Sequence, residues 1–196
     1  MPLVRPALAE ELQQVGTTLA AAFAGDPVWS WLASPKADWS PRAASWFATE
    51  AQLQMNGHGE VLVDDQLRGA AIWAQPDHWK ASPREMVSLT VPTVRLFRAK
   101  TLRGMRTMSA MEKLHPTAPH WYLAILGTDP AHQGHGIGSA LIGAITDRCD
   151  EQGLPAYLES SKEQNVAFYA RHGFEVTGQP RLPGGPEIWL MWREPR

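Results

Sequence analysis

Residues 121–139 read WYLAILGTDPAHQGHGIGS, and this stretch decides the fold. Its apolar first part predicts a buried central strand over 121–128. Asp129 and Pro130 end that strand, and a glycine-rich loop leads into residues 137–152, where apolar residues recur at helical spacing. A second short strand is predicted over 156–160. The order of strand, loop, helix and strand favours a parallel pair with a right-handed crossover.

The loop from Gln133 to Ser139 contains glycine at every second position and opens the predicted helix. A helix N-terminus presents free backbone N–H groups and favours negative charge, and glycine lets a bulky anion approach the backbone. The spacing is not the dinucleotide fingerprint, because Ser139 stands where its third glycine would be. The Gly-Lys-Ser/Thr ending of nucleotide-hydrolase loops is also missing. A diphosphate is the expected ligand.

The remaining segments predict a mixture of helices and strands. Helices are predicted over 8–24, which Gly25-Asp26-Pro27 should end, and over 41–56. A hairpin is predicted over 60–64 and 67–75. Residues 82–114 have a helical pattern that Pro92 and Gly104 are expected to break. The last elements are a short helix over 162–172, with Ser161 and Gln164 spaced as a capping box, and strands over 174–177 and 188–192.

Composition excludes several classes of protein. With 196 residues, 44% of them hydrophobic, and a net charge of −2, the chain is expected to form one globular domain and not to coat nucleic acid. One cysteine rules out a disulfide framework. No signal peptide or membrane-spanning run is apparent, so a cytoplasmic protein without a membrane partner is expected. His132 and His135 straddle the glycine loop without a third ligand nearby in sequence, so no metal site is expected.

The motif Gln133-x-x-Gly136-x-Gly138 after a strand resembles the acetyl-coenzyme A signature of the GNAT N-acetyltransferases. Residues 155–161, 165–169 and 172–174 look like the antibiotic-acetylating branch that includes puromycin N-acetyltransferase. The resemblance implies one α/β domain over 1–196, with a mixed twisted central sheet of about seven strands flanked by helices. It weakens before Pro119, so residues 1–118 would mainly serve the acceptor and residues 119–196 mainly acetyl-CoA.

The resemblance also implies roles for individual residues. Tyr169 matches the tyrosine that protonates the departing thiolate, and Asn165 matches the asparagine that meets the cofactor. Asn165 and Tyr169 are four positions apart, hence on one helical face. Acetyl would move directly to an amine, because Cys149 falls on the apolar stripe of its helix and is expected to be a buried structural thiol. The cofactor-binding residues implied are Leu126, Gly127 and Thr128 of the strand and Gln133, Gly134, His135, Gly136, Ile137, Gly138 and Ser139 of the loop.

The general base is less directly indicated. Many family members carry a glutamate early in the fourth strand, where this sequence has Trp121 and Tyr122. Glu159, at the end of the next strand, and His120, just before the fourth, are the candidates. An imidazole has a suitable ordinary pKa of about 6.5. An amine that arrives neutral would need no base.

The acceptor side is rich in tryptophan, with nine tryptophans against three tyrosines in the chain. Trp29, Trp46 and Trp73 are expected to line a pocket for an apolar or aromatic, antibiotic-like amine, although they could equally be core residues. On the pocket interpretation, Trp29→Ala and Trp46→Ala should raise the acceptor KM. The protein is expected to be a monomer or homodimer.

Two other functions remain open at this stage. One is acetylation of protein or aminoacyl-tRNA amines through a local basic stretch. The other interpretation of that stretch is a solvated helix face. The other function is a non-catalytic acyl-CoA sensor, against which Tyr169 argues. The basic stretch consists of Arg95, Arg98, Lys100, Arg103 and Arg106.

Replacing Gly136 by Asp should abolish acetyl-CoA binding, because a side chain and a negative charge would both intrude on the diphosphate. Isothermal titration calorimetry measures the loss, and circular dichroism checks that the variant is folded. Native affinity in a folded variant would contradict the assignment of the loop.

Overall fold

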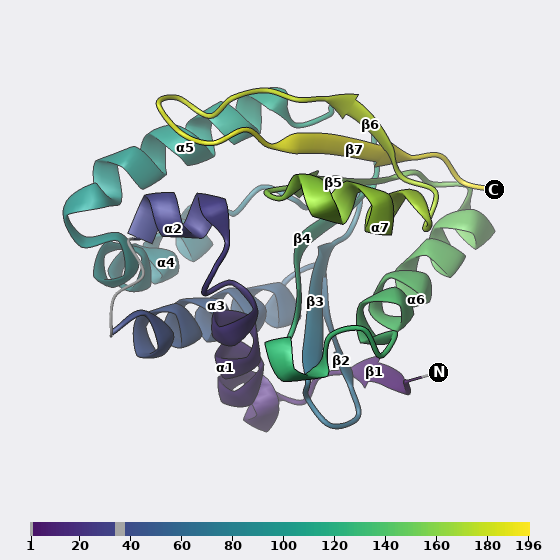
Figure 1. The fold of residues 1–196 in the computed structure, drawn as a ribbon, viewed down its shortest axis with the longest axis horizontal. Coiled ribbons are helices and arrows are strands. Elements are labelled where there is room, and N and C mark those ends of the chain that lie inside the picture. Colours follow the sequence, from purple (N-terminus) through teal and green to yellow (C-terminus); the bar gives the residue numbers. More distant parts are fainter. Residues whose placement is uncertain (1, 34–37) are drawn as a thin grey trace.

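The computed structural model describes residues 2–33 and 38–196, which form one α/β domain around a seven-stranded mixed sheet (Figure 1). The strand order is β1-β2-β3-β4-β5-β7-β6, with β4 and β5 parallel and the other neighbours antiparallel. This confirms the predicted fold class. The strands are β1 (Val4–Pro6), β2 (Gly59–Asp64), β3 (Gly69–Ala74), β4 (Trp121–Thr128), β5 (Ala156–Ser160), β6 (Glu175–Gly178) and β7 (Trp189–Arg193).

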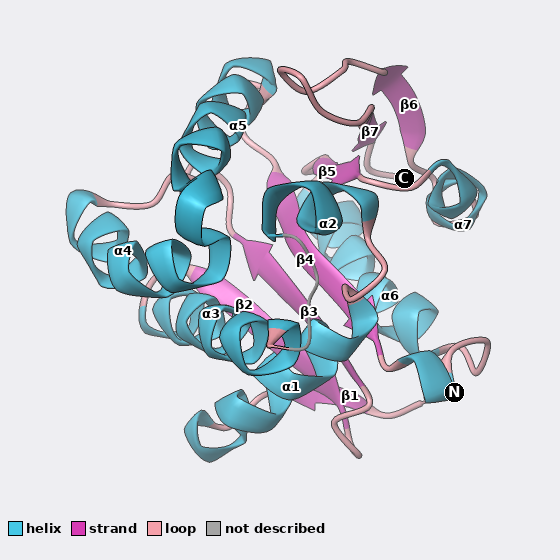
Figure 2. Cartoon of the chain, turned by 60° about the vertical axis from the view of Figure 1, so that its left-hand side comes forward, coloured by secondary structure: helices cyan, strands magenta, loops and turns pink. Residues whose placement is uncertain are grey.

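Helices cover both faces of the sheet, and each face has its own hydrophobic core (Figures 1 and 2). One core lies under α1 (Leu12–Ala22), α2 (Pro27–Ala33), α3 (Trp39–Asn56) and α4 (Pro83–Phe97). The other lies under α6 (Ile137–Gln152) and α7 (Val166–Ala170). Helix α5 (Thr101–Leu114) packs against α2 and α4. Single turns of 3-10 helix occur at Ala9–Glu11, Arg98–Lys100, Pro130–His132 and Glu163–Asn165.

The two central strands, β4 and β5, separate soon after they meet. Their parallel pairing extends only from Trp121–Ala156 to Leu123–Leu158. Beyond it, β4 continues beside β3 and β5 continues beside β7. A register shift between β3 and β4 at Ile72/Trp73 accompanies the change, and such a bulge bends the strand that carries the extra residue. The β4 edge from Ala124 onward therefore turns away from β5.

Helix α1 lies directly on the diverging half of β4 because Gly127 has no side chain. A Cβ at Gly127 would lie 2.8 Å from Leu19 Cδ2 and 2.9 Å from Ala22 Cβ of α1, which is closer than real side chains pack. Gly127, for which the sequence resemblance implies cofactor binding, sets the distance between α1 and the sheet.

Two local features differ from the predictions. The first helix ends before Gly25-Asp26-Pro27 as predicted, but Pro27 also begins α2, a helix that the sequence analysis did not predict. The Asp26 carboxylate accepts the N–H groups of Val28 at 2.9 Å and Trp29 at 3.1 Å. Proline suits a first helical position, where no N–H partner is needed. The break in 82–114 falls at Arg98, where φ is +50°, and leaves Pro92 inside α4 and Gly104 inside α5.

Of the three tryptophans expected in the acceptor pocket, only Trp73 is fully enclosed, being 0% exposed in the core under α6. Trp29 and Trp46 are half-buried and pack against the other core. Trp29 lies 5.1 Å from both Trp46 and Phe47, ring centre to ring centre, in an aromatic cluster. The Trp46 indole N–H donates to Thr93 Oγ1 at 3.0 Å. Trp73 therefore stabilises the fold and is not free to receive a ligand.

Within the described residues, no helix has both the length and the apolar character that crossing a membrane requires.

Truncating Trp73 tests its structural role. Trp73→Ala should lower the free energy of unfolding by about 3–5 kcal/mol, the usual loss for a buried large aromatic residue. Trp73→Phe is the matched control and should lose much less. It keeps most of the volume and removes an indole N–H that has no hydrogen-bond partner among the described residues. Urea denaturation measures both, and equal stability of the alanine variant and wild type would contradict the assignment.

Candidate active site

The glycine loop between β4 and α6 is exposed to solvent and contains two glycines with positive φ. Gly134 and Gly136 both have φ of +79°, a conformation that other residues rarely adopt, and Gly136 is the N-cap of α6. The loop is braced by its own side chains, since the Gln133 amide donates to the Thr128 carbonyl at 3.2 Å. Gln133, Gly134, His135 and Gly136 are exposed. Their positions leave the N-terminus of the 16-residue helix α6 facing outward.

The other loop residues are held differently. Ile137 is buried in the core under α6 and anchors the helix start. A Cβ at Gly138 would lie 3.2 Å from the Phe168 ring, so this glycine admits α7 beside α6. The Ser139 hydroxyl hydrogen-bonds to His172 Nε2 at 3.1 Å. Any contact of Ile137 or Gly138 with a ligand would therefore involve their backbone atoms.

Leu126, Gly127 and Thr128 lie on the half of β4 that has parted from β5. They pair on their other side with Ala71, Ala70 and Gly69 of β3, respectively. The strand therefore presents a backbone edge toward the place where β5 would otherwise continue.

Tyr169 lies on α7 and is 8% exposed. Its ring packs in the core under α6, against Phe168 and Phe174. Burial raises the pKa of the Tyr169 hydroxyl well above its ordinary value, and the negative charge of Asp26 raises it further. Tyr169 is consequently a neutral hydrogen-bond donor at physiological pH. Asn165 precedes α7 on a half-buried turn, four residues earlier.

Asp26, which sequence reasoning did not single out as functional, ties the two faces of the molecule together. It is 2% exposed, and one carboxylate oxygen caps α2. The other oxygen accepts the Ser161 hydroxyl, from the segment after β5. Ser161 therefore does not form the capping box predicted for the 162–172 helix. An aspartate before a proline is a common helix start, so the signal was present in the sequence.

Glu159 and His120, the two candidate bases, belong to one buried network. The Tyr122 hydroxyl donates to Glu159 Oε2 at 2.8 Å, and His115 Nδ1 lies 3.7 Å from Glu159 Oε1. His115 and His120 meet through their Nε2 atoms at 3.0 Å. Burial raises the pKa of Tyr122 well above its usual value, with the Glu159 charge adding to it. His115, which connects Glu159 to His120, was not predicted as a site residue.

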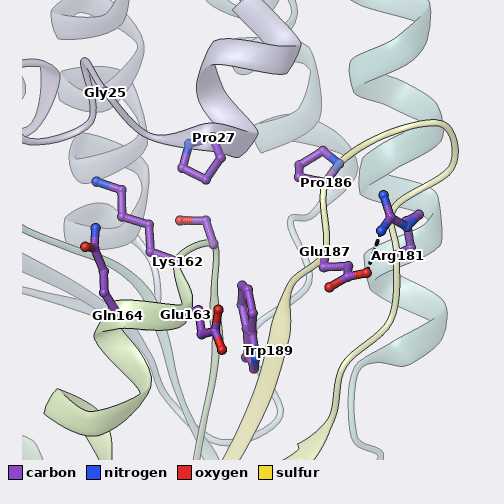
Figure 3. A pocket seen from close by; sticks show the side chains of 10 residues that line it. Gly25, Pro27, Lys162, Glu163, Gln164, Arg181, Pro186, Glu187 and Trp189 are labelled. Atoms are coloured by element: carbon purple, nitrogen blue, oxygen red, sulfur yellow. Dashed lines mark hydrogen bonds and ion pairs between the residues drawn. The ribbon is translucent and has the colours of Figure 1, made fainter.

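A pocket of about 570 Å³ opens between the start of α2, the end of β5 and the chain leading into β7 (Figure 3). In Figure 3 the Trp189 ring lies between Glu163 and Glu187, and Pro27 and Pro186 lie above it. Arg181 and Glu187 pair across its rim at 2.5 Å. Trp29, Trp46 and Trp73 are not among its lining residues, which are Gly25, Pro27, Ser161, Lys162, Glu163, Gln164, Arg181, Pro186, Glu187 and Trp189.

Other chemistries receive little support. Cys149 is 0% exposed, and burial raises the pKa of its thiol to about 12, which disfavours a thiolate nucleophile. Across the described ranges, no group of three or more His, Cys, Asp or Glu residues is arranged to hold a metal ion. Part of the basic stretch is engaged within the protein, because Arg98 pairs with Asp38 and Arg103 donates to the Trp31 carbonyl at 3.2 Å.

Comparison with known proteins gives several matches. The Corynebacterium glutamicum structure described as histone acetyltransferase HPA2 and related acetyltransferase superposes with a TM-score of 0.74 and 26% identity, covering 100% of this chain and 97% of that one. A Drosophila melanogaster polyamine N-acetyltransferase shares the fold, with a TM-score of 0.66 and 14% identity over 99% of this chain and 100% of its own.

Among sequences, an uncharacterised N-acetyltransferase of Schizosaccharomyces pombe is 44% identical over 54 residues, or 28% of this chain. The match spans 22% of that relative's length. The profile of the Acetyltransferase (GNAT) family matches residues 63–174, more than half of the 196 residues. The matched region contains the diverging strands, the glycine loop and α7. The chain therefore belongs to the GNAT acetyltransferase family.

Proposed function

We propose that this protein transfers acetyl from acetyl-CoA directly to the amine of a small molecule. The observation that carries the proposal is the parting of β4 from β5 beside the open glycine loop at the N-terminus of α6. The second half of β4 offers an open backbone edge, and the helix end that follows it along the chain can bind an anion. Together they suit a ligand with an amide-bearing arm and a diphosphate. The GNAT family uses acetyl-CoA as its cosubstrate.

The residues present fit that ligand. The exposed backbone of Gly134 and Gly136 would receive the diphosphate, and the β4 edge at Leu126 to Thr128 would hydrogen-bond the pantetheine arm. A backbone N–H near Leu126 would stabilise the oxyanion that forms as the amine attacks the thioester. Acetyl-CoA supplies the activated acetyl group, and no metal enters the proposed reaction.

Tyr169 is proposed as the acid that protonates the departing thiolate. Its raised pKa keeps the hydroxyl protonated before the reaction, so a proton is in place when negative charge develops on sulfur. Asn165 would contact the cofactor from the same helical face. A sensor that only bound acyl-CoA would have no use for this donor.

Glu159 is proposed as the base that takes the proton of the acceptor amine. Its side chain is 6% exposed and receives one hydrogen bond, from Tyr122, on Oε2. A carboxylate shielded from water interacts strongly with an approaching ammonium group, which favours both binding and proton transfer.

The acceptor is proposed to bind in the pocket around Trp189, and to be a small apolar or aromatic amine of the kind acetylated by the puromycin-like branch. The indole of Trp189 supplies the aromatic surface that the sequence suggested for Trp29, Trp46 and Trp73. Pro27 and Pro186 extend it with apolar contacts (Figure 3). Acetylation of macromolecules is less well supported, because Arg98 and Arg103 have partners within the chain. A monomer or homodimer in the cytoplasm remains the expected form.

Tyr169→Phe tests the acid. The variant should bind acetyl-CoA with native affinity and lose about 10²–10⁴-fold in kcat, the range for one acid–base group. The ring is kept, so the core packing that Phe168 and Phe174 provide is unchanged. Rapid-quench measurement of the chemical step, with calorimetry of acetyl-CoA as the control, separates the two effects. An unchanged chemical step would refute the assignment.

A panel of amines tests the acceptor. Consumption of acetyl-CoA is measured with each of six amines: tryptamine, puromycin, spermidine, agmatine, kanamycin and a lysine peptide. The aromatic amines tryptamine and puromycin should give the highest kcat/KM. Trp189→Ala should raise their KM about tenfold, equivalent to roughly 1.4 kcal/mol of lost stacking and contact. Trp189→Phe, which keeps an aromatic ring, should lose less. A preference for kanamycin, or equal KM values in all three proteins, would count against the aromatic pocket.

A further inference from the structure

His115 and His120 form a buried pair whose protonation is fixed by geometry. Their Nε2 atoms lie 3.0 Å apart, so one of the two must carry a hydrogen and the other must accept it. His120 Nδ1 lies 2.6 Å from the Ala118 carbonyl oxygen, which can only accept, so His120 carries its hydrogen on Nδ1. Burial lowers the pKa of His120 and favours this neutral form. The Nε2 hydrogen between the rings therefore belongs to His115.

The other nitrogen of His115 faces the proposed base. Nδ1 lies 3.7 Å from Glu159 Oε1, and the two side chains are 3% and 6% exposed. Both ring nitrogens of His115 thus face a group that can accept an N–H, the Glu159 carboxylate on the Nδ1 side and the neutral His120 ring at Nε2. Water hardly reaches this arrangement.

Aromatic rings around His115 also favour a positive charge. The Trp79 ring stacks on the imidazole with centres 3.6 Å apart and planes 21° apart. Tyr122 and Tyr157 stand nearly perpendicular to it, at 4.7 Å and 4.9 Å. The electron-rich face of an indole attracts a cation placed over it.

Several other ionisable groups lie around this histidine pair. Glu159 and Tyr157 lie on β5 and Tyr122 on β4, and the Lys80 ammonium lies 5.1 Å from the centre of the Trp79 ring. The charge of Asp77 acts on the pKa of His120, and the charge of Glu50 on α3 acts on the pKa of Tyr122.

We propose that His115 is the proton store of the acetyl-transfer reaction, with His120 holding it in the correct tautomer. This proposal rests on the proposed function. The N–H bond of the acceptor ammonium breaks and its proton goes to the Glu159 carboxylate. The O–H bond so formed then breaks as the proton moves to His115 Nδ1, which leaves Glu159 ionised beside an imidazolium. After the products leave, the proton returns from His115 Nδ1 to the Glu159 carboxylate, and from there it passes to water that enters the emptied site.

A proton store is useful because a carboxylate is a weaker base than an imidazole. A glutamate carboxyl ordinarily has a pKa of about 4.3 and holds a proton poorly at neutral pH, whereas an imidazole has one of about 6.5. Passing the proton to His115 lets a carboxylate that contacts the amine work with the basicity of a histidine. His115 and His120 act through Glu159 and do not touch the acceptor, so they are positioning residues.

The first experiment measures kcat/KM for tryptamine, or for the best amine of the panel, from pH 5 to 9. His115→Gln should lose about 10²-fold at pH 7, and the acid limb of its profile should move to lower pH, because the remaining carboxylate protonates at lower pH than an imidazole. His58→Gln, at an exposed histidine remote from this network, is the matched control and should match wild type. A uniform loss with an unmoved acid limb, or no loss, would overturn the proposal.

A second experiment needs no acceptor. NMR of the histidine Cε1–H resonances follows the protonation of His115 in wild type and in Glu159→Gln, with His115→Gln used to assign the His115 signal. Without the carboxylate, His115 should gain its second proton only at a lower pH than in wild type. Identical titrations would overturn the proton store by itself. A wild type that acetylates no amine of the panel would remove the proposed function, whatever the titrations show.

Discussion

The sharing of the β4 backbone between two neighbours is the constraint on which the remaining structure depends. Its first residues hydrogen-bond to both β3 and β5, but the pairing with β5 ends at Leu123. Backbone N–H and C=O groups are costly to leave unpaired away from water. The open edge of β4 therefore offers N–H and C=O groups to an extended ligand. The family to which the chain belongs uses acetyl-CoA, whose pantetheine arm is such a ligand.

The two faces contribute unequal parts of the site. The face of α6 and α7 supplies the loop, Asn165 and Tyr169, all from a short stretch of sequence with strong local signals. The opposite face supplies Asp26 from the start of α2 and His115 from the end of α5, which reach the carboxyl-terminal half through Ser161 and Glu159. These two contacts join the faces at either side of the end of β5. The proposed acid, Tyr169, and the proposed base, Glu159, thus each have a neighbour from the far half of the chain.

Sequence reasoning succeeded where the determinants are local. Strand 121–128, helix 137–152 and strand 156–160 agree with β4, α6 and β5 residue for residue, because an apolar run, a glycine N-cap and a glycine C-cap mark their ends. It was incomplete where one residue type serves two purposes. Gly25-Asp26-Pro27 does follow the end of α1, but the start of α2 at Pro27 was missed because proline also begins helices. The break predicted at Pro92 was wrong, since this proline lies inside α4.

The site shows the same division. The glycine spacing predicted the loop, whereas the roles of Asn165 and Tyr169 were predicted from the family resemblance, which their spacing of four residues supports. The contact between His115 and Glu159 could not, because it depends on how α5 returns to the sheet. Tryptophan content indicated many aromatic contacts but not which face each indole occupies. Trp73, on a central strand, is in the core, whereas Trp189 reaches the pocket.

The Asp26 carboxylate has a consequence for the order of events at the site. One oxygen holds the first turn of α2, which borders the pocket, and the other holds Ser161, while its charge acts on the Tyr169 hydroxyl. In the proposed reaction, an acceptor that shifted α2 would move this charge, and the pKa of the Tyr169 hydroxyl would change with it. Occupancy of the proposed pocket and proton donation to the leaving group would then be linked through a single side chain, without a moving domain.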